Sequence, residues 1–376
     1  MSNETEKIMG FDETDPGKLE NKSWEPVSDR KIRVGIAGYG ICQFGASFGF
    51  QSHPNVDVVA VTDLDPEGCR KLAEATHCQN TYSCFEDMIG NDQVEAVFIA
   101  TDAPSHARLS ILALERGKHV GCAVPATFGS LEEADALYEA VKTTGMRYMM
   151  FETSAFRPDC YIMRKAFDTG LLGRIVYSQG EYYHYFREAL GSHEKWRTGM
   201  PPMWYPTHST AYYIAVTGGY YTDVSCLGFR GNIGHYQMGE NRYHNLFDSE
   251  TALLKTDQGG MSRMNVTFGA AGSGGERGEV HGEFGTVVGT EFSPKDKIKN
   301  PDLFTKPQLP PGMEAGGHGG SHGYLTDEFI TSILEDRDPL INIAWSLNMT
   351  VPGIIAHESA LRDGEWMKVP YYSWPK

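Results

Sequence analysis

Apolar and polar positions follow two alternating rhythms along the first part of the chain. Short apolar runs predict buried strands, and the stretches between them have the three-to-four-residue spacing of amphipathic helices. The predicted strands are residues 32–37, 56–62, 94–100, 119–123 and 147–151. Buried strands that alternate with helices indicate a parallel, doubly wound α/β sheet.

Helix start and stop signals support this pattern. Asp65 precedes Pro66 and is suited to cap a helix that begins there, and Ser130 and Glu133 have the spacing of a capping box. Gly145 is placed to end the helix after Ser130, and Gly117 to end a helix over 105–116.

The rhythm changes after about residue 153. Longer strands are predicted at 175–185, 251–256, 260–268 and 279–288, with helices at 158–169, 208–217, 324–335 and 344–362. We therefore expect an arm over 1–30, a Rossmann domain over 31–152, and a second α/β domain over 153–376. We expect the second domain to have a large, open, mostly antiparallel sheet and its last helix to pack back on the first domain.

Composition excludes several classes of protein. The formal net charge of −16 disfavours binding to nucleic acid. The absence of an apolar run of 18 residues predicts no membrane-spanning helix. Seven scattered cysteines without a CxxC pair predict neither disulfides nor zinc, so we expect a cytoplasmic protein without a metal.

A glycine-rich turn follows the first strand directly. Gly38, Tyr39 and Gly40, with Ile41 after them, let a backbone approach a pyrophosphate closely. Asp63 ends the second strand, where a carboxylate binds an adenosine ribose, and no Arg follows it to meet a 2′-phosphate. The pattern favours NAD over NADP, although a tight turn and a capping carboxylate would leave the same residues.

The continuation resembles the Gfo/Idh/MocA oxidoreductases. The stretch Ala100-Thr101-Asp102-Ala103-Pro104-Ser105-His106 is similar to their ATPxxxH motif, and Gly117-Lys118-His119-Val120 follows in register. The resemblance spans about residues 31–365. It implies NAD contacts from Thr101, His106 and Pro125, an open sheet that faces the nicotinamide, and a homodimer or homotetramer paired through that sheet.

One position departs from the dehydrogenases of this family. They carry Glu-Lys-Pro where this chain has Ala123-Val124-Pro125, and Val124 cannot move a proton. Several motifs look closer to a branch without that Lys, the NAD-dependent glycosidases such as glycoside hydrolase family 109. These are Tyr148–Glu152 (YMMFE), Tyr182-Tyr183-His184 with Arg187, Trp204–His208 (WYPTH) and Gly316–Gly320 (GGHGG).

The resemblance implies roles for single residues. Glu152 would lie near the nicotinamide and the sugar, and His318 would lie on a loop that closes the site. The residues expected to line the sugar are Tyr182, His184, Tyr205 and His208. With Glu152, these four are the candidate catalytic residues.

His208 is the strongest of these candidates. A helix N-terminus is expected to lower its pKa and keep it a neutral base, with Thr207 placed to cap that helix. Each candidate also has a structural explanation. His208 would cap its helix, and Tyr205 would be a buried core residue. Tyr182 and His184 would form a surface pair on the sheet, Glu152 would form a structural ion pair, and His318 would belong to a metal-binding segment.

Basic and aromatic residues gather before this segment. Arg187, Lys195, Trp196 and Arg197 are candidates for binding an anionic group on the substrate, such as the sulfonate of a sulfoquinovoside. The alternative is a solvated loop.

The resulting hypothesis is an NAD-dependent glycoside hydrolase that acts on an anionic glycoside. It uses transient C3 oxidation, elimination, water addition and re-reduction, with tightly bound NAD that rests as NAD⁺. The first alternative is an NAD-dependent sugar or cyclitol dehydrogenase. The second is a non-catalytic NAD-binding sensor.

Overall fold

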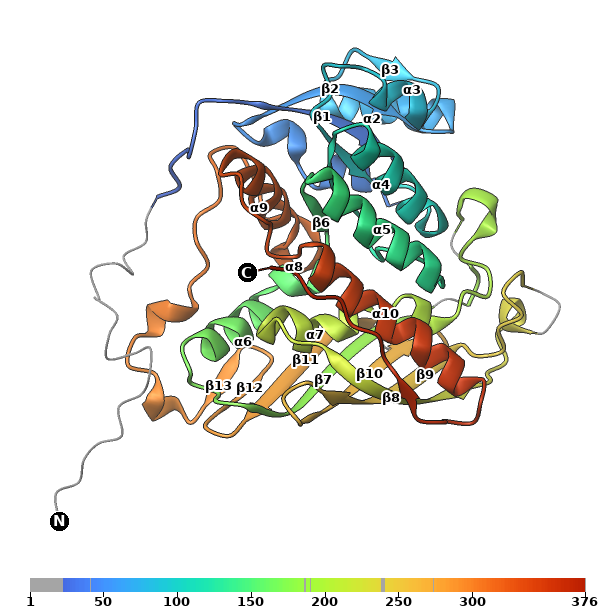
Figure 1. The fold of residues 1–376 in the computed structure, drawn as a ribbon, viewed down its shortest axis with the longest axis vertical. Helices are drawn as coiled ribbons and strands as arrows, with labels where there is room; N and C mark the ends of the chain where they lie inside the picture. Colours follow the sequence, from blue (N-terminus) through green and yellow to red (C-terminus); the bar gives the residue numbers. More distant parts are fainter. Residues whose placement is uncertain are drawn as a thin grey trace.

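The computed structural model describes residues 23–375, except 41, 186, 190, 238–240 and 273. Within them the chain forms two β-sheets with helices packed around and between them (Figure 1). Most of the predicted N-terminal arm, residues 1–22, lies outside the described residues.

The first sheet is entirely parallel, with the strand order β3-β2-β1-β4-β5-β6. Its strands are β1 (Ile32–Ala37), β2 (Val56–Thr62), β3 (Thr81–Tyr82), β4 (Ala96–Ile99), β5 (His119–Cys122) and β6 (Tyr148–Met150). The five predicted strands are all present, which confirms the doubly wound sheet. The edge strand β3 was not predicted, because two residues are too short to show a period.

Helices of the first half begin and end largely where their cap residues predict. They are α1 (Phe44–Ser47), α2 (Pro66–Thr76), α3 (Phe85–Ile89), α4 (His106–Glu115) and α5 (Leu131–Thr144). The Asp65 carboxylate accepts the first N–H groups of α2, and the Ser130 hydroxyl accepts the Glu133 N–H at 3.1 Å. Gly145 ends α5 with a φ of 67°, a left-handed conformation that glycine adopts at little cost.

The second sheet has eight strands in the order β13-β12-β11-β7-β10-β9-β8-β14. They are β7 (Ile175–His184), β8 (Tyr221–Phe229), β9 (Ser249–Thr256), β10 (Met261–Thr267), β11 (Gly274–Gly282), β12 (Thr286–Val288), β13 (Glu291–Ser293) and β14 (Met367–Lys368). Only the β7–β10 pair is parallel, so the mostly antiparallel sheet is confirmed.

One predicted strand is wrong. Residues 279–288 form a hairpin rather than a single strand, because the chain reverses where the Gly282 N–H bonds to the Gly285 carbonyl. The prediction also missed β8 and began β11 at residue 279, five residues after its first residue, Gly274.

The helices of the second half are α6 (Pro158–Asp168), α7 (Thr207–Thr217), α8 (Gly317–Gly320), α9 (His322–Leu334) and α10 (Ile343–Ala360). Of these, α6, α7 and α10 contact the second sheet and cover one of its faces, whereas α9 contacts the first half, where the Thr326 hydroxyl donates to the Phe48 carbonyl (Figure 1). Short 3₁₀ turns lie at Phe50–Ser52, Ala103–Ser105, Ser154–Phe156, His193–Lys195, Pro202–Trp204, Gly234–Tyr236, Lys295–Lys297 and Pro301–Phe304. Helix α10 contacts α5 and β6 of the first half as well as α7 and β8 of the second.

Helix α7 lies unusually close to the sheet. A Cβ added to Gly180 of β7 would meet the Ser209 carbonyl oxygen at 1.9 Å, and one added to Gly278 of β11 would meet the Tyr212 ring at 2.2 Å. Two strand positions without side chains therefore let α7 sit directly on the sheet. Residues 207–216 are all buried as a result.

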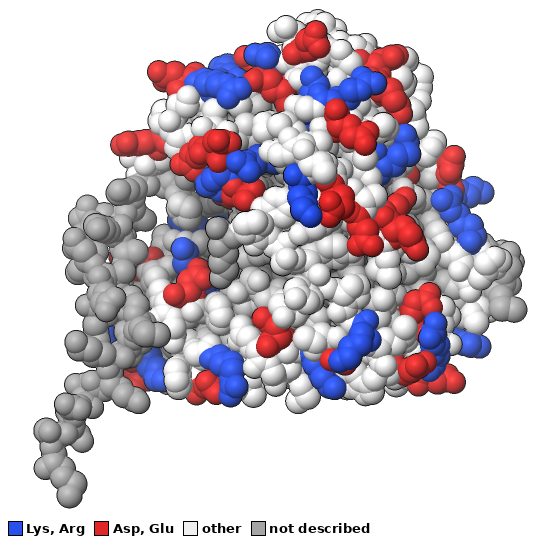
Figure 2. Space-filling view, in the orientation of Figure 1, with Lys and Arg blue, Asp and Glu red and all other residues white. Residues whose placement is uncertain are grey.

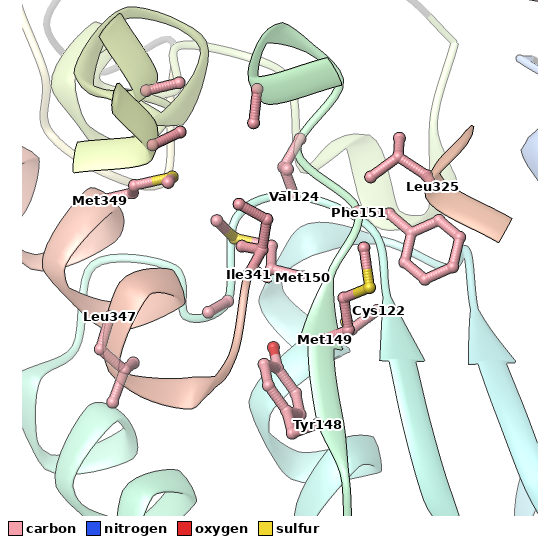
Figure 3. Packing of buried hydrophobic residues seen from close by; sticks show 14 of the residues in the cluster. Cys122, Val124, Tyr148, Met149, Met150, Phe151, Leu325, Ile341, Leu347 and Met349 are labelled. Atoms are coloured by element: carbon pink, nitrogen blue, oxygen red, sulfur yellow. The ribbon is translucent and has the colours of Figure 1, made fainter. Parts of the chain in front are cut away.

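A continuous apolar core joins the two halves. Figure 3 shows part of it, with Cys122 at the end of β5, Val124 on the loop after it, Tyr148–Met150 of β6, and Leu347 and Met349 of α10. On the face seen in Figure 2, acidic and basic side chains are interspersed, without a continuous basic surface among the coloured residues. In the described part of the chain, no helix combines the length and apolarity needed to cross a membrane.

Candidate functional site

A cleft opens beyond the carboxyl ends of β1, β2 and β4, where ligands bind to open parallel sheets. Its wall includes Gly38, Tyr39, Gly40, Asp63 and Thr101. Gly38 has a φ of 95°, and a Cβ there would lie 2.4 Å from the Ala100 carbonyl oxygen, so no other residue fits. Ile41, predicted with this group, lies outside the described residues.

Gly45 takes the place of the missing third glycine of the motif. A Cβ on Gly45 would lie 2.3 Å from the Gly38 carbonyl oxygen. Because glycine has no Cβ, α1 can pack against the glycine-rich turn. The motif is therefore complete in space, although its last glycine comes two residues later than in GxGxxG.

Asp63, which follows β2, forms hydrogen bonds with the glycine-rich turn. Its Oδ2 accepts the Tyr39 N–H at 2.7 Å, and its Oδ1 accepts the Asp65 N–H at 2.8 Å. The carboxylate is half-buried and lines the cleft. Each oxygen keeps a further lone pair, so the structural role and a role in binding a ribose hydroxyl are compatible.

Thr101 and His106 hold different positions around the cleft. The Thr101 hydroxyl oxygen is buried without a hydrogen-bond partner among the described residues, and the residue lines the cleft. His106 is buried instead, with its ring nitrogens 2.8 Å from the Pro125 carbonyl oxygen and 3.4 Å from that of Thr101. His106 and Pro125 thus join two loops behind the cleft wall rather than lining it.

These features fit a dinucleotide. A carboxylate stands at one end of the cleft, a glycine-rich backbone in the middle, and an unpartnered hydroxyl beyond it. Asp63, Gly38–Gly40 and Thr101 are the residues that would hold NAD.

A buried histidine–glutamate pair lies beyond the end of β6. Nδ1 of His208, the second residue of α7, donates to Oε1 of Glu152 at 2.8 Å. The Glu152 side chain is fully buried, and its Oε1 also accepts the Ser154 N–H at 2.9 Å. The bond at Nδ1 leaves Nε2 of His208 as the atom available to a substrate.

The charge state of His208 differs from the prediction. Burial alone would lower the pKa of His208, but the carboxylates of Glu152 and Glu276 outweigh burial and raise its pKa to about 9. His208 is therefore a protonated imidazolium near neutral pH, not the neutral base that the helix N-terminus predicted. Thr207 is also the first residue of α7 rather than its cap.

Two tyrosine rings surround His208. The Tyr182 ring lies 4.6 Å from the His208 ring and the Tyr205 ring lies 5.6 Å from it, measured between centroids. Burial raises the pKa of Tyr205 to about 12 against the opposing effect of Arg197, and burial also raises that of Tyr182. Both hydroxyls are thus neutral. His184 follows on the same face of β7, with its ring 6.2 Å from that of Tyr182.

Glu276 is a site residue that the sequence did not indicate. It lies directly opposite Tyr182 on β11, with its Oε2 2.7 Å from the Ser154 hydroxyl and 4.0 Å from Nδ1 of His208. The prediction began this strand at residue 279. Extending it back by alternation would have placed Glu276 on the buried face.

His318 lies in α8, the single glycine-rich turn before α9. Its Nδ1 is 2.8 Å from Nε2 of His322, and Nδ1 of His322 is 3.1 Å from the Ser47 carbonyl oxygen on α1. Burial and His208 lower the pKa of His318, against the opposing effect of Glu276. Among the residues that the structure describes, no three His, Cys, Asp or Glu side chains converge as metal ligands do.

The four predicted anion-binding residues differ in exposure, and only two of them line the cleft. Arg187 and Lys195 are exposed, whereas Trp196 is buried and lines the cleft with Arg197. The Arg197 guanidinium stacks on the Trp196 ring at 4.2 Å. Because residues 193–195 form a 3₁₀ turn, Lys195 and Arg197 do not share a face.

Fold and site together define an enzyme with a nucleotide cleft in a Rossmann domain and buried ionisable groups at the junction with a second, open sheet. Residues 32–152 match the Gfo/Idh/MocA model, described as an oxidoreductase family with an NAD-binding Rossmann fold. This part of the chain is therefore a Gfo/Idh/MocA domain.

Curated relatives carry the name glycosyl hydrolase family 109 protein. Protein 1 of this name from Bacteroides fragilis is 30% identical over 162 residues, which cover 41% of this chain and 35% of the relative. Several such matches therefore span less than half of the relative's length. The relative from Solibacter usitatus is 22% identical over 91% of this chain and 88% of its own.

Solved structures share the whole fold. Levoglucosan dehydrogenase in complex with NADH and L-sorbose has a TM-score of 0.74 at 19% identity, over 91% of this chain and 100% of that one. Myo-inositol 2-dehydrogenase from Lactobacillus plantarum has a TM-score of 0.69, also at 19% identity, with the same coverage of both chains.

Proposed function

We propose that the protein is an NAD-dependent glycoside hydrolase that oxidises its sugar transiently and ends redox-neutral. The observation that carries this proposal is the buried Glu152–His208 pair, with Nδ1 and Oε1 2.8 Å apart at the junction of the two domains. It presents a proton donor to the site, and glycoside cleavage requires such a donor at the leaving oxygen. The relatives named glycosyl hydrolase family 109 support the same reading.

Val124 argues against an ordinary dehydrogenase. Its side chain is 7% exposed and belongs to the apolar core, on the loop beyond β5 (Figure 3). The position at which the family's dehydrogenases carry a proton-transferring Lys is thus part of the packing here. The ionisable groups at this junction come from the second domain and from Glu152 instead.

Different residues of the chain would donate the proton, orient the sugar and exclude water. Bound NAD would supply a hydride acceptor and, later in the cycle, a hydride donor. His208 protonates the leaving oxygen. Glu152 orients the His208 ring and stabilises its protonated form. The neutral hydroxyls of Tyr182 and Tyr205 orient the sugar hydroxyls, while Trp196 and the tyrosine rings exclude water.

Arg197 supports an anionic substrate, and a sulfoquinovoside is the named case that we propose. No ion pair joins the Arg197 guanidinium to a carboxylate within the described residues, although it acts on the pKa values of Tyr205 and His184. A cation without a protein counter-charge can bind a carboxylate or sulfonate on the sugar. Arg187 and Lys195 are not included in this proposal, because both are exposed and neither lines the cleft.

The open face of the second sheet is proposed to pair two copies of the chain. Exposed apolar side chains on this face are Leu227, Phe229, Leu253 and Met261. A face with several such residues is typical of an interface. A monomeric mass by light scattering would contradict this proposal, and Leu253→Asp is expected to dissociate a dimer.

The test is an incubation of the purified protein with NAD and a panel of p-nitrophenyl glycosides, following both nitrophenol and free NADH. Release of nitrophenol without net NADH supports the glycosidase. Net NADH without nitrophenol supports the alternative, a sugar or cyclitol dehydrogenase. If neither appears across the panel, both enzyme proposals fail and a non-catalytic sensor is favoured.

A further inference from the structure

A second buried histidine–glutamate pair lies against the turn that leads into Tyr205. Nδ1 of His357 on α10 donates to Oε1 of Glu250 on β9 at 2.8 Å. The other oxygen of this glutamate, Oε2, accepts the Met203 N–H at 2.7 Å. The exposed fractions of the histidine and glutamate side chains are 4% and 0%. Since Met203 lies in the 3₁₀ turn Pro202–Trp204, one glutamate connects α10, the second sheet and this turn.

Ionisable residues at these two positions break the local pattern. Strand β9 alternates, and its buried positions include Glu250, Ala252 and Leu254. His357 belongs to a helix whose residues are nearly all buried. An apolar side chain would fill either position without the free-energy cost of burying an ionisable group. A departure of this kind is typical of a residue that serves function rather than packing.

The turn is packed closely on two other sides. A Cβ added to Gly353 of α10 would lie 2.0 Å from the Met203 carbonyl oxygen. A Cβ added to Gly129 of the first half would lie 2.6 Å from the Trp204 ring. The turn therefore lies between the first half of the molecule and α10, and Glu250 reaches it from the second sheet.

Tyr205 depends on this turn more directly than His208 does. The Tyr205 N–H donates to the Pro202 carbonyl at 3.0 Å, which closes the turn. His208 follows three residues later and has its own buried contact, with Glu152 at 2.8 Å. The segment is thus held by one buried glutamate near each end, and Glu250 holds the end that leads into Tyr205.

We infer that Glu250 and His357 are positioning residues for Tyr205, and that they act through the N–H of Met203. The inference rests on the proposed function, in which Tyr205 orients the sugar hydroxyls. His357 occupies one oxygen of Glu250 and so keeps the other directed at the turn. Both residues are proposed to act through the turn and not on the substrate.

The hydrogen-bonding capacity of the side chains supplies sharp variants. Glu250→Gln keeps the shape of the side chain, but its amide has only one oxygen. It can therefore not accept both the His357 N–H and the Met203 N–H. His357→Asn keeps an N–H donor for Glu250, whereas His357→Leu has none. A displacement of about 1 Å in a positioned group can slow a reaction about 100-fold, so these changes are large enough to measure.

The first test reads the position of Tyr205 directly and needs no activity. Fluorine NMR of protein labelled with 3-fluorotyrosine is assigned with Tyr205→Phe, and with Tyr138→Phe for a reference signal on α5. Glu250→Gln and His357→Leu are expected to shift or broaden the Tyr205 signal and to leave that of Tyr138. Glu279→Gln, from a partly exposed histidine–glutamate pair on β11, is the matched control and should leave both. An unchanged Tyr205 signal in both variants would overturn the inference.

The second test asks whether Glu250 acts through Tyr205. Glu250→Gln is expected to lower kcat/KM for nitrophenol release from an aryl glycoside about 10–100-fold. In a Tyr205→Phe background the same substitution is expected to have little further effect, because the hydroxyl that it positions is already absent. NAD affinity measured by calorimetry should stay like that of wild type. An equal fall of kcat/KM in both backgrounds would show a merely structural role and overturn the inference.

The third test is rescue by the conservative variant. His357→Asn is expected to keep the Tyr205 signal and kcat/KM closer to wild type than His357→Leu does, and urea unfolding checks that both variants are folded. Equal effects of the two would overturn the role of His357, and the pair gives the same fluorine comparison if Glu250→Gln does not fold. An inactive wild type would refute the proposed glycosidase, whereas the fluorine signals alone decide whether the pair positions Tyr205.

Discussion

Nδ1 of His208 and Oε1 of Glu152 lie 2.8 Å apart in a fully buried contact between the second residue of α7 and the loop after β6. The pair joins the two halves of the molecule at the site. It also sets the charge of the imidazole, because the carboxylate overcomes burial and raises the pKa of His208 to about 9.

Glu152→Gln is expected to move the alkaline limit of activity to lower pH. The acid form of His208 is the working form, so activity falls as pH rises through its pKa, and removing the nearby negative charge lowers that pKa. A displacement of about 1–3 pH units in the kcat profile is expected. Glu283→Gln, on an exposed turn, is the control, and an unchanged alkaline limit in Glu152→Gln would contradict the acid role.

Gly180→Ala is expected to destabilise the protein by about 1–3 kcal/mol, since a Cβ would clash with the backbone of α7. Because that helix carries His208, kcat should fall as well. Urea unfolding of the variant is compared with Gly234→Ala, where a Cβ meets nothing within 4 Å. Equal stability of the two variants would show that α7 does not depend on this close approach.

Local patterns predicted much of the fold because they depend on neighbours in the chain. The Asp65 and Ser130 caps and the five core strands are of this kind. The hairpin at 279–288 was missed because its turn, Glu283–Gly285, interrupts the apolar pattern only briefly. The start of β11 was missed because Gly274 and Gly275 have no side chains that could contribute to an alternating apolar pattern.

Sequence motifs predicted which residues form the candidate site, but not the protonation states of those residues. Motifs indicated His208, Glu152 and His318, and the structure places the first two in contact. The pKa of His208 could not be predicted, because it depends on Glu276, which lies 68 positions away in the chain and opposite Tyr182 in the sheet. Likewise, the hydrogen bond between His322 and the Ser47 carbonyl joins residues far apart in the chain, so sequence patterns could not indicate it.

Asp63→Asn is expected to weaken NAD binding about 10–100-fold, because a hydrogen bond to a charged group contributes about 1.5–3 kcal/mol. Calorimetric titration of protein stripped of cofactor measures this. Asp57→Asn, an exposed position on β2, the strand that Asp63 directly follows, should bind like wild type. Unchanged affinity in Asp63→Asn would limit Asp63 to its contacts with Tyr39 and Asp65.

Arg197→Ala is expected to reduce the preference for an aryl sulfoquinovoside or glucuronide over an aryl glucoside by about 10–100-fold. Lys195→Ala, two residues away but exposed, is the matched control and should leave the preference unchanged. The values of kcat/KM for the three substrates provide the comparison. If the neutral glucoside is the best substrate of wild type, the anionic-substrate proposal is wrong. A loss of NAD affinity with unchanged preference would place Arg197 on the cofactor instead.

Hydrolysis of an aryl glycoside in D₂O by protein that carries NAD tests the central claim most directly, with the aglycone, free NADH and the label at C2 measured in one reaction. The account predicts aglycone release, no net NADH, and deuterium at C2 of the sugar, because the C2 proton is lost and regained through solvent. Aglycone release with hydrogen retained at C2 would contradict it, since the bond would then break without elimination.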